Sequence, residues 1–286
     1  MSASHFVRRS LLALYLSVIA AGVFAQAQPA QEQFQPQVGQ EGKDVVWVPT
    51  PQALVEKMLD MAKVAPQDYV IDLGSGDGRT VITAAKRGAR ARGIEYNPDM
   101  VELSKRNAAK EGVSDKTHFV QADLFESDLS EATVITMFLL PEINLKLRPR
   151  ILDLKTGTRI VSNTFTMGEW TADQTATVSD DCVSYCTALL WVVPAKVEGT
   201  WELPQGELRL RQTFQMITGT LRSGMVVAPI TNGRLRGDQV SFSAGGAQYT
   251  GRVSGNAIEG AVKSGGSNRR WSATRAGVPA AAPSRP

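Results

Sequence analysis

Two carboxylates and three glycines stand together in one short stretch of the chain. The stretch reads Val70-Ile-Asp-Leu-Gly-Ser-Gly-Asp-Gly-Arg79, so that Asp72 precedes the glycines and Asp77 lies among them. The apolar residues at its start predict a buried strand, and a helical pattern follows it. A glycine-rich turn between a strand and a helix lets the backbone approach a ligand closely and aims the amide groups at the start of the helix toward it. The stretch therefore predicts a pocket for a nucleotide-like ligand.

Two classes of nucleotide-like ligand compete for this turn. The dinucleotide motif G-x-G-x-x-G requires glycine at position 79, where this chain has Arg79. The pyrophosphate of a dinucleotide would also be repelled by Asp72 and Asp77. The same two carboxylates attract a ligand that carries an ammonium and a sulfonium group, by roughly a few kcal/mol at an intermediate effective dielectric constant. The turn therefore favours a sulfonium ligand.

Further acidic residues follow the next two predicted strands. Glu95 ends the second strand and is followed by Tyr96, whereas Asp123 follows the third strand. Together with Asp72 they resemble the class I S-adenosylmethionine-dependent methyltransferases, whose first motif is an acidic residue followed by a glycine-rich turn. The resemblance implies that Glu95 binds the ribose hydroxyls, that Tyr96 lies against the adenine and that Asp123 binds the adenine amino group. The implied cofactor-binding residues are Thr50, Asp72, Gly74, Ser75, Gly76, Asp77, Gly78, Glu95, Tyr96, Asp123 and Leu124.

A closer resemblance covers roughly residues 46–170. It rests on motifs that occur together in the order Val48-Pro-Thr-Pro51, Asp72-Leu-Gly-Ser-Gly-Asp-Gly-Arg79, Ala84-Ala-Lys-Arg-Gly88, Gly93-Ile-Glu95, Asp123-Leu-Phe125, Ser127-Asp-Leu-Ser130, Leu139-Leu-Pro141 and Gly157-Thr-Arg159. These look like the protein-lysine methyltransferases that modify the c subunit of the mitochondrial ATP synthase and adenine nucleotide translocase, and their bacterial relatives. The resemblance implies lysine N-methylation, S-adenosylmethionine as cofactor, and a Pro-Thr segment that closes over the cofactor with Thr50 near its methionine end. The N-terminal start and the strand-rich C-terminal part depart from this family.

Methyl transfer to a lysine requires that the amine first lose its proton. From a reference pKa of about 10.4 this costs about 4 to 5 kcal/mol at pH 7, and a desolvating channel offsets part of the cost. Phe138, Leu140 and Pro141 follow the fourth predicted strand and are the candidates for such a substrate channel. The alternative for all three is packing in the core of the sheet.

Glu142 is the nearest carboxylate to this channel and the catalytic candidate, as a proton acceptor or an anchor for the amine. The alternative is a first-turn glutamate that stabilises its own helix. Phe165 and Trp170 either line the acceptor site or pack.

The elements that position these residues alternate between strand and helix. The pattern predicts strands at 69–73, 90–95, 117–121, 133–140 and 159–163, and helices at 50–61, 79–87, 97–110 and 142–154 with a candidate break at Pro149. Such alternation is typical of a parallel sheet with both faces covered. Two more strands at 175–179 and 187–193, joined without a helix, fit the antiparallel last strand of the methyltransferase class. The predicted fold class is α/β, a Rossmann-like seven-stranded methyltransferase sheet with an antiparallel last strand.

The C-terminal part, from Val197 to Thr274, has no helical period. Short alternating runs separated by glycines predict seven or eight strands in a small all-β meander, a barrel or a sandwich. The formal net charge of the chain is +3, and the positive residues of this part are mostly single arginines spread along the strands. That distribution is typical of a solvated face, so no nucleic-acid partner is predicted.

The first residues have the form of an export signal. Arg8 and Arg9 precede an apolar run at 11–24, and Ala25 marks the expected cleavage site. The run is short for a bilayer span, so a retained anchor is the weaker alternative. Arg8-Arg-Ser-Leu-Leu12 also resembles a twin-arginine signal, which directs export of folded proteins. These residues predict an exported, periplasmic protein.

The chain has two cysteines, Cys182 and Cys186. In an oxidising compartment they can form a local disulfide, whereas two cysteines alone make an incomplete metal site, so no metal is predicted. The predicted segments are a signal peptide at 1–25, a Gln- and Pro-rich disordered leader at 26–43, an S-adenosylmethionine-binding methyltransferase domain at 44–194, a β-rich domain at 195–275 and a disordered tail at 276–286.

Three functions fit these observations. The first is a methyltransferase with a protein lysine as its acceptor. The second is a small-molecule methyltransferase, which would share every cofactor-binding residue. The third is an exported binding module that has kept the fold without the activity, since the cofactor is made in the cytoplasm.

Overall fold

A computed structural model describes residues 34–277. The predicted signal peptide, the leader up to residue 33 and the tail from residue 278 lie outside the described residues. Within residues 34–277, no helix is both long enough and apolar enough to cross a membrane.

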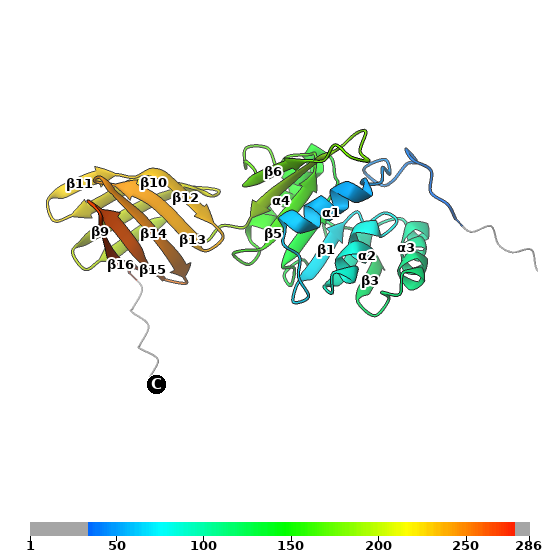
Figure 1. Cartoon of the computed structure of the whole chain (residues 1–286), viewed down its shortest axis with the longest axis horizontal. Helices are drawn as coiled ribbons and strands as arrows, with labels where there is room; N and C mark the ends of the chain where they lie inside the picture. Colours follow the sequence, from blue (N-terminus) through cyan, green and yellow to red (C-terminus); the bar gives the residue numbers. More distant parts are fainter. Residues whose placement is uncertain (1–33, 278–286) are drawn as a thin grey trace, which may run out of the picture. The chain divides into compact units, whose positions relative to one another are not determined.

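A seven-stranded sheet forms the first part of the structure (Figure 1). Its strands lie in the order β3-β2-β1-β4-β5-β7-β6, and β7 is antiparallel to both of its neighbours whereas β1 to β5 are parallel. This confirms the predicted methyltransferase sheet with its antiparallel last strand. The strands are β1 (Tyr69–Leu73), β2 (Arg90–Glu95), β3 (Thr117–Gln121), β4 (Val134–Met137), β5 (Arg159–Asn163), β6 (Gln174–Thr177) and β7 (Thr187–Val192).

Helices cover both faces of this sheet because successive side chains of its strands point to opposite sides. Val70 of β1 packs in a core with α1 and α2, whereas its neighbour Ile71 packs in a second core with α4. The helices are α1 (Gln52–Met61), α2 (Arg79–Lys86), α3 (Pro98–Lys110) and α4 (Pro141–Leu152). Both faces of the sheet are therefore buried, as its continuous apolar strands predict.

Two predicted boundaries near β4 and α4 differ from the structure. The strand expected to reach Leu140 ends at Met137, so Phe138 to Leu140 lie in a connection to the helix. The candidate break at Pro149 does not occur, and α4 continues through it to Leu152. Pro149 removes one backbone hydrogen bond, but Leu147 and Ile151 on either side are fully buried, and their packing holds the helix together.

The C-terminal part is an eight-stranded antiparallel barrel, which decides between the barrel and the sandwich (Figure 1). Consecutive strands pair as a meander, and pairing of β16 with β8 closes the barrel. β11 and β12 pair with successive parts of β10 and together fill one position in the wall. The strands are β8 (Gly199–Leu203), β9 (Gly206–Thr213), β10 (Met216–Ser223), β11 (Val226–Pro229), β12 (Thr231–Arg236), β13 (Gln239–Ala244), β14 (Ala247–Ser254), β15 (Ala257–Ser264) and β16 (Ser267–Arg275).

Candidate active site

A cavity of about 400 Å³ lies at the carboxyl ends of β1, β2 and β4. It is the position where ligands bind in open parallel sheets, beside the point at which the strand order reverses. The cavity brings together most of the residues that the sequence singles out: Thr50, Asp72, Gly74, Ser75, Gly76, Asp77, Glu95, Tyr96, Asp123, Leu124, Phe138 and Leu140.

The glycine turn forms one wall of the cavity. Gly74 and Gly76 adopt φ angles of 71° and 54°, in the left-handed region that side chains disfavour. A Cβ atom at Gly76 would lie 2.7 Å from Nε1 of Trp47, so the indole packs directly on the turn. Only glycine allows this close approach.

Asp72 is the buried carboxylate of the site. Its side chain lies at the end of β1, is 6% exposed and accepts a hydrogen bond of 2.6 Å from the Thr136 hydroxyl. Burial, together with the neighbouring charges of Glu95 and Asp77, raises the pKa of Asp72 to about 7 against the opposing effect of the hydrogen bond from Thr136. A cationic ligand group beside Asp72 would reverse this effect by favouring the ionised form.

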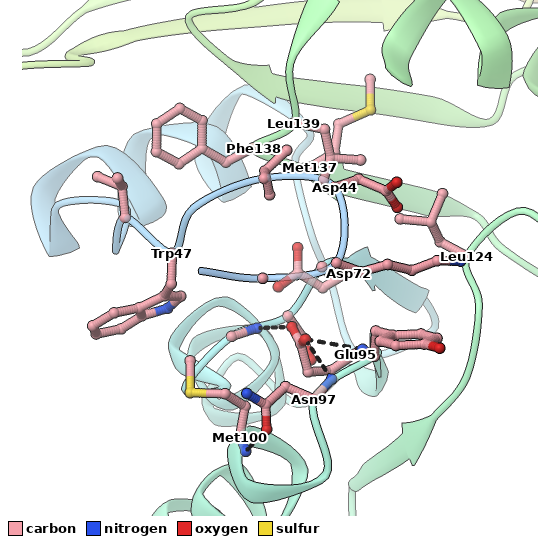
Figure 2. Close-up of a pocket in the computed structure, with 18 of the residues that line it drawn as sticks. Asp44, Trp47, Asp72, Glu95, Asn97, Met100, Leu124, Met137, Phe138 and Leu139 are labelled. Carbon is pink, nitrogen blue, oxygen red and sulfur yellow. Dashed lines mark hydrogen bonds between the residues drawn. The ribbon is translucent and has the colours of Figure 1, made fainter. Parts of the chain in front are cut away.

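Glu95 is fixed by three backbone amides, as Figure 2 shows. Its Oε2 accepts from the N–H of Gly76 at 2.9 Å, and its Oε1 accepts from Tyr96 and Asn97 at 2.9 and 3.0 Å. A carboxylate offers about four acceptor directions. One direction on Oε2 thus remains for a ligand hydroxyl, in agreement with the role expected for Glu95.

Asp123 is engaged by a lysine that the sequence analysis did not single out. Lys43 Nζ lies 2.5 Å from the Asp123 carboxylate and 4.7 Å from the centre of the Tyr96 ring. The hydrogen bond from Lys43 lowers the pKa of Asp123. Lys43 belongs to the predicted leader, whose last residues form a turn in which the N–H of Gly39 donates to the carbonyl of Trp47 at 2.9 Å.

The segment around Trp47 passes over the cavity (Figure 2). Thr50 ends it, is 8% exposed, and accepts on its hydroxyl a hydrogen bond of 3.4 Å from Asn163. Lys43 ends the Gln- and Pro-rich leader and Trp47 lies in the short segment after it, neither of which shows periodicity, so their position could be found only from the tertiary structure.

The charges of the cavity fit a sulfonium nucleoside. The two cationic side chains that line it, Lys43 and Arg79, are each paired with a carboxylate, Arg79 with Asp77 at 2.6 Å. Asp72 stays buried without a cationic partner in the hydrogen bonds of the described residues. A pyrophosphate would meet repulsion here, whereas a ligand with positive groups near Asp72 and hydroxyls near Glu95 finds matching partners.

Three predicted site residues lie outside the lining of the cavity. Gly78 is the N-cap of α2, and a Cβ there would lie 2.9 Å from the Phe119 ring, so its role is close packing. Pro141 is the first residue of α4, and Glu142 is exposed in the first turn of that helix. Glu142 is thus placed where the helix-stabilising alternative puts it.

An aromatic group lines the cavity beside Leu140. Phe138 and Phe165 are stacked with ring centres 5.8 Å apart. Tyr185, which the sequence analysis missed, completes the group from the connection between β6 and β7. Trp170, by contrast, is fully buried and packs on Trp191, with ring centres 6.3 Å apart.

Comparisons with known proteins agree with this geometry. Residues 72–174 match the family model of the ANTKMT methyltransferase domain. A protein-lysine N-methyltransferase of Saccharolobus islandicus (strain REY15A) is 42% identical over 152 residues, which is 52% of this chain and 94% of that protein. The adenine nucleotide translocase lysine N-methyltransferase of Mus musculus is 34% identical over 118 residues, 41% of this chain and 51% of the mouse protein. The chain thus spans about half the length of the mouse relative.

Among solved structures, an RNA methyltransferase from Salinibacter ruber in complex with S-adenosyl-L-homocysteine is 47% identical, with a TM-score of 0.49. The similarity covers 52% of this chain and 96% of that chain. The Saccharolobus enzyme is matched over nearly its whole length, and the family model begins at Asp72, the buried carboxylate of the cavity. The chain belongs to the family of S-adenosylmethionine-dependent protein-lysine N-methyltransferases.

Proposed function

We propose that this chain transfers a methyl group from S-adenosylmethionine to the side-chain amine of a lysine in a protein. The observation that carries the proposal is one cavity lined by two chemically different groups of residues. Asp72 and Glu95 are carboxylates, whereas Phe138, Leu140 and Phe165 are apolar. The first set suits the cofactor, and the second suits a long aliphatic side chain.

Bound S-adenosylmethionine supplies a methyl group already activated on a sulfonium. The chain therefore has to hold two reactants in line rather than build a reactive group. Glu95 holds one ribose hydroxyl through its free acceptor direction, and Asp72 attracts the positively charged end of the cofactor. Leu140 and the aromatic rings exclude water around the acceptor amine, which lowers its pKa and favours the neutral, nucleophilic form.

Incubation with tritiated S-adenosylmethionine tests this function. The purified chain is mixed with an extract from a strain that lacks its gene, and label is measured separately in the protein, RNA and small-molecule fractions. We expect label in protein, located on lysine by mass spectrometry. Label confined to small molecules or to RNA would show that the acceptor is not a protein lysine.

Calorimetry with S-adenosyl-L-homocysteine gives the matching control. Binding with transfer to protein supports the proposal. Binding without transfer to any fraction would favour a non-catalytic module with the same fold, and absence of binding would refute every enzymatic alternative.

We also propose that the chain works outside the cytoplasm, in the periplasm. The export signal at 1–25 supports this, as does the bond between Cys182 and Cys186, because disulfides persist in oxidising compartments. Cell fractionation tests the location. We expect the mature chain in the periplasmic fraction, and the double substitution R8K/R9K should leave precursor in the cytoplasm if export follows the twin-arginine route.

A further inference from the structure

Three aromatic rings meet in the lining of the cavity although they come from three different connections. Phe138 follows β4, Phe165 follows β5, and Tyr185 lies between β6 and β7. The centre of the Tyr185 ring is 5.1 Å from that of Phe138 and 5.9 Å from that of Phe165. These distances are typical of aromatic rings in direct contact. All three rings line the same cavity as Asp72.

A disulfide holds the segment that carries Tyr185. Cys182 and Cys186 are bonded and close a small loop in the connection between β6 and β7. Val178 at the base of the loop donates its N–H to the carbonyl of Cys186 at 3.0 Å, which joins the loop to the sheet. Within the loop the side chain of Val183 is fully exposed, whereas Tyr185 is 41% exposed and its ring contacts the aromatic pair.

The backbone of Tyr185 is in an uncommon conformation. Its φ angle is 56°, in the left-handed region that residues with a Cβ atom rarely adopt. A free loop would leave this conformation, so the surrounding structure must hold it. The disulfide and the contacts with Phe138 and Phe165 are the features that do so.

We propose that Tyr185 contacts the acceptor, and that the Cys182–Cys186 disulfide holds its ring in the position where, with Phe138 and Phe165, it receives the side chain of the acceptor lysine. The inference rests on the proposed function, because it takes lysine as the acceptor. Aromatic faces pack against the aliphatic stem of a lysine side chain, so three rings suit its four methylene groups. Asp72 and Glu95 are assigned to the cofactor, so the residues proposed for the acceptor are a separate set.

If this proposal is right, binding of the acceptor lysine requires the intact disulfide. Reduction frees the loop at 182–186, and Tyr185 loses the closure that opposes its relaxation to a negative φ angle. Acceptor binding then weakens while cofactor binding stays unchanged. Methyl transfer should therefore be more efficient in an oxidising compartment than in a reducing one.

Single substitutions in the loop test the role of Tyr185. Three variants are compared: Tyr185→Ala, Tyr185→Phe, and Val183→Ala as the matched control. The readouts are the apparent KM for acceptor protein, in extract from the strain lacking the gene, and the Kd for S-adenosyl-L-homocysteine. Tyr185→Ala should raise the apparent KM about tenfold, in line with loss of an aromatic ring that packs against the lysine stem, and leave the Kd unchanged. Tyr185→Phe and Val183→Ala should match the wild type.

Removal of the disulfide provides the second measurement. The double variant C182S/C186S, and the wild type treated with dithiothreitol, should both show a raised apparent KM with an unchanged Kd for S-adenosyl-L-homocysteine. Dithiothreitol should have no effect on the double variant, which separates the disulfide from other effects of the reductant. A wild-type chain indifferent to dithiothreitol would overturn the role of the disulfide.

The two proposals fail in different ways. If the wild type binds S-adenosyl-L-homocysteine and labels no protein, the proposed function is refuted, and this inference is refuted with it. If the wild type labels protein and Tyr185→Ala has the same apparent KM, only the role of Tyr185 falls. A Tyr185→Ala variant that loses cofactor binding as well would also count against a role confined to the acceptor.

Discussion

At the scale of single residues, Asp72 is the carboxyl group whose ionised form the site disfavours. It is a carboxylate 6% exposed, near Glu95 and Asp77, and paired in hydrogen bonding with the neutral Thr136. Burial with like charges nearby stabilises the protonated form of the free enzyme. Titration of Asp72 should therefore be coupled both to cofactor binding and to stability.

Cofactor affinity is expected to rise with pH. Burial raises the pKa of Asp72 to about 7, and the positive end of the cofactor needs the ionised form. Affinity for S-adenosylmethionine should therefore fall by up to about tenfold for each pH unit below 7, measured by calorimetry from pH 5.5 to 8.5. In Asp72→Asn the affinity should be lower at pH 8 and nearly independent of pH. A flat profile for the wild type would contradict this account.

The same carboxyl group makes an opposite prediction for the stability of the free enzyme. The pKa of Asp72 is higher in the folded chain, at about 7, than in the unfolded chain, where it is about 4. The folded state binds the proton more tightly, so the contribution of Asp72 to the free energy of unfolding falls as pH rises from about 4 to about 7. Asp72→Asn should thus have the higher Tm at pH 8, with a smaller difference at pH 5, as measured by thermal unfolding without cofactor.

Lys43 pairs with Asp123, the carboxylate that the family resemblance assigns to the adenine amino group. Its ammonium lies 2.5 Å from Asp123 and over the Tyr96 ring, in a pair that is partly exposed. The cofactor must displace it to reach Asp123, and exposed ion pairs of this kind are weak. Lys43→Ala should therefore raise affinity for S-adenosyl-L-homocysteine by up to about fivefold, measured by calorimetry. Lys105→Ala, which breaks an exposed pair with Glu102 on α3, is the matched control and should leave the affinity unchanged.

At the scale of the elements, the start of α4 favours the helix-stabilising role of Glu142 over the catalytic one. The helix begins at Pro141, so Glu142 lies in its first turn, exposed and outside the lining of the cavity. A carboxylate in that turn interacts favourably with the positive end of the helix. Loss of its charge should weaken the helix without removing a group from the reaction.

Glu142→Gln should therefore keep the rate of methyl transfer within about twofold of the wild type. It should lower the free energy of unfolding by about 0.5 kcal/mol. The measurements are the tritium assay and denaturant unfolding. A loss of activity by two orders of magnitude, with cofactor affinity preserved, would restore Glu142 as a catalytic residue.

At the scale of the whole molecule, the barrel closes through a short seam between β16 and β8. β16 and β8 pair through Thr274 with Glu202 and Arg275 with Trp201, whereas β9 and β10 pair along their full lengths. Arg275 reinforces the seam, since its guanidinium donates to the carbonyls of Glu198 and Lys196 at 2.7 and 2.6 Å. It also lies 4.4 Å from the centre of the Trp201 ring.

Arg275→Ala should accordingly open the barrel at this seam. We expect a lower Tm and faster amide hydrogen exchange in β8 and the end of β16 than in β9 and β10. The control is Arg269→Ala, an exposed arginine on the same strand, which should behave as the wild type. Equal exchange in the two variants would show that Arg275 does not hold the seam.

The sequence by itself determined the sheet and the cofactor class and singled out most of the polar residues that line the cavity, because these depend on local signals. Apolar strands, a glycine turn whose Gly74 and Gly76 require positive φ angles, and acidic residues at strand ends are all written in consecutive residues. The barrel was predicted only as a meander, because closure depends on whether β16 reaches β8 across the whole domain. The ends of β4 and α4 were misplaced because tertiary packing, rather than local propensity, sets them.

Only the tertiary structure decided what surrounds the cofactor residues. Lys43 pairs with a carboxylate 80 positions away, and Tyr185 reaches Phe138 and Phe165 from a separate connection. No periodicity marks either residue, since each acts alone and its partners are distant in the chain. Charge pairing between Lys43 and Asp123 and the contacts of Tyr185 with the two phenylalanine rings join residues that are distant in the chain, so only the tertiary structure shows that they line one cavity.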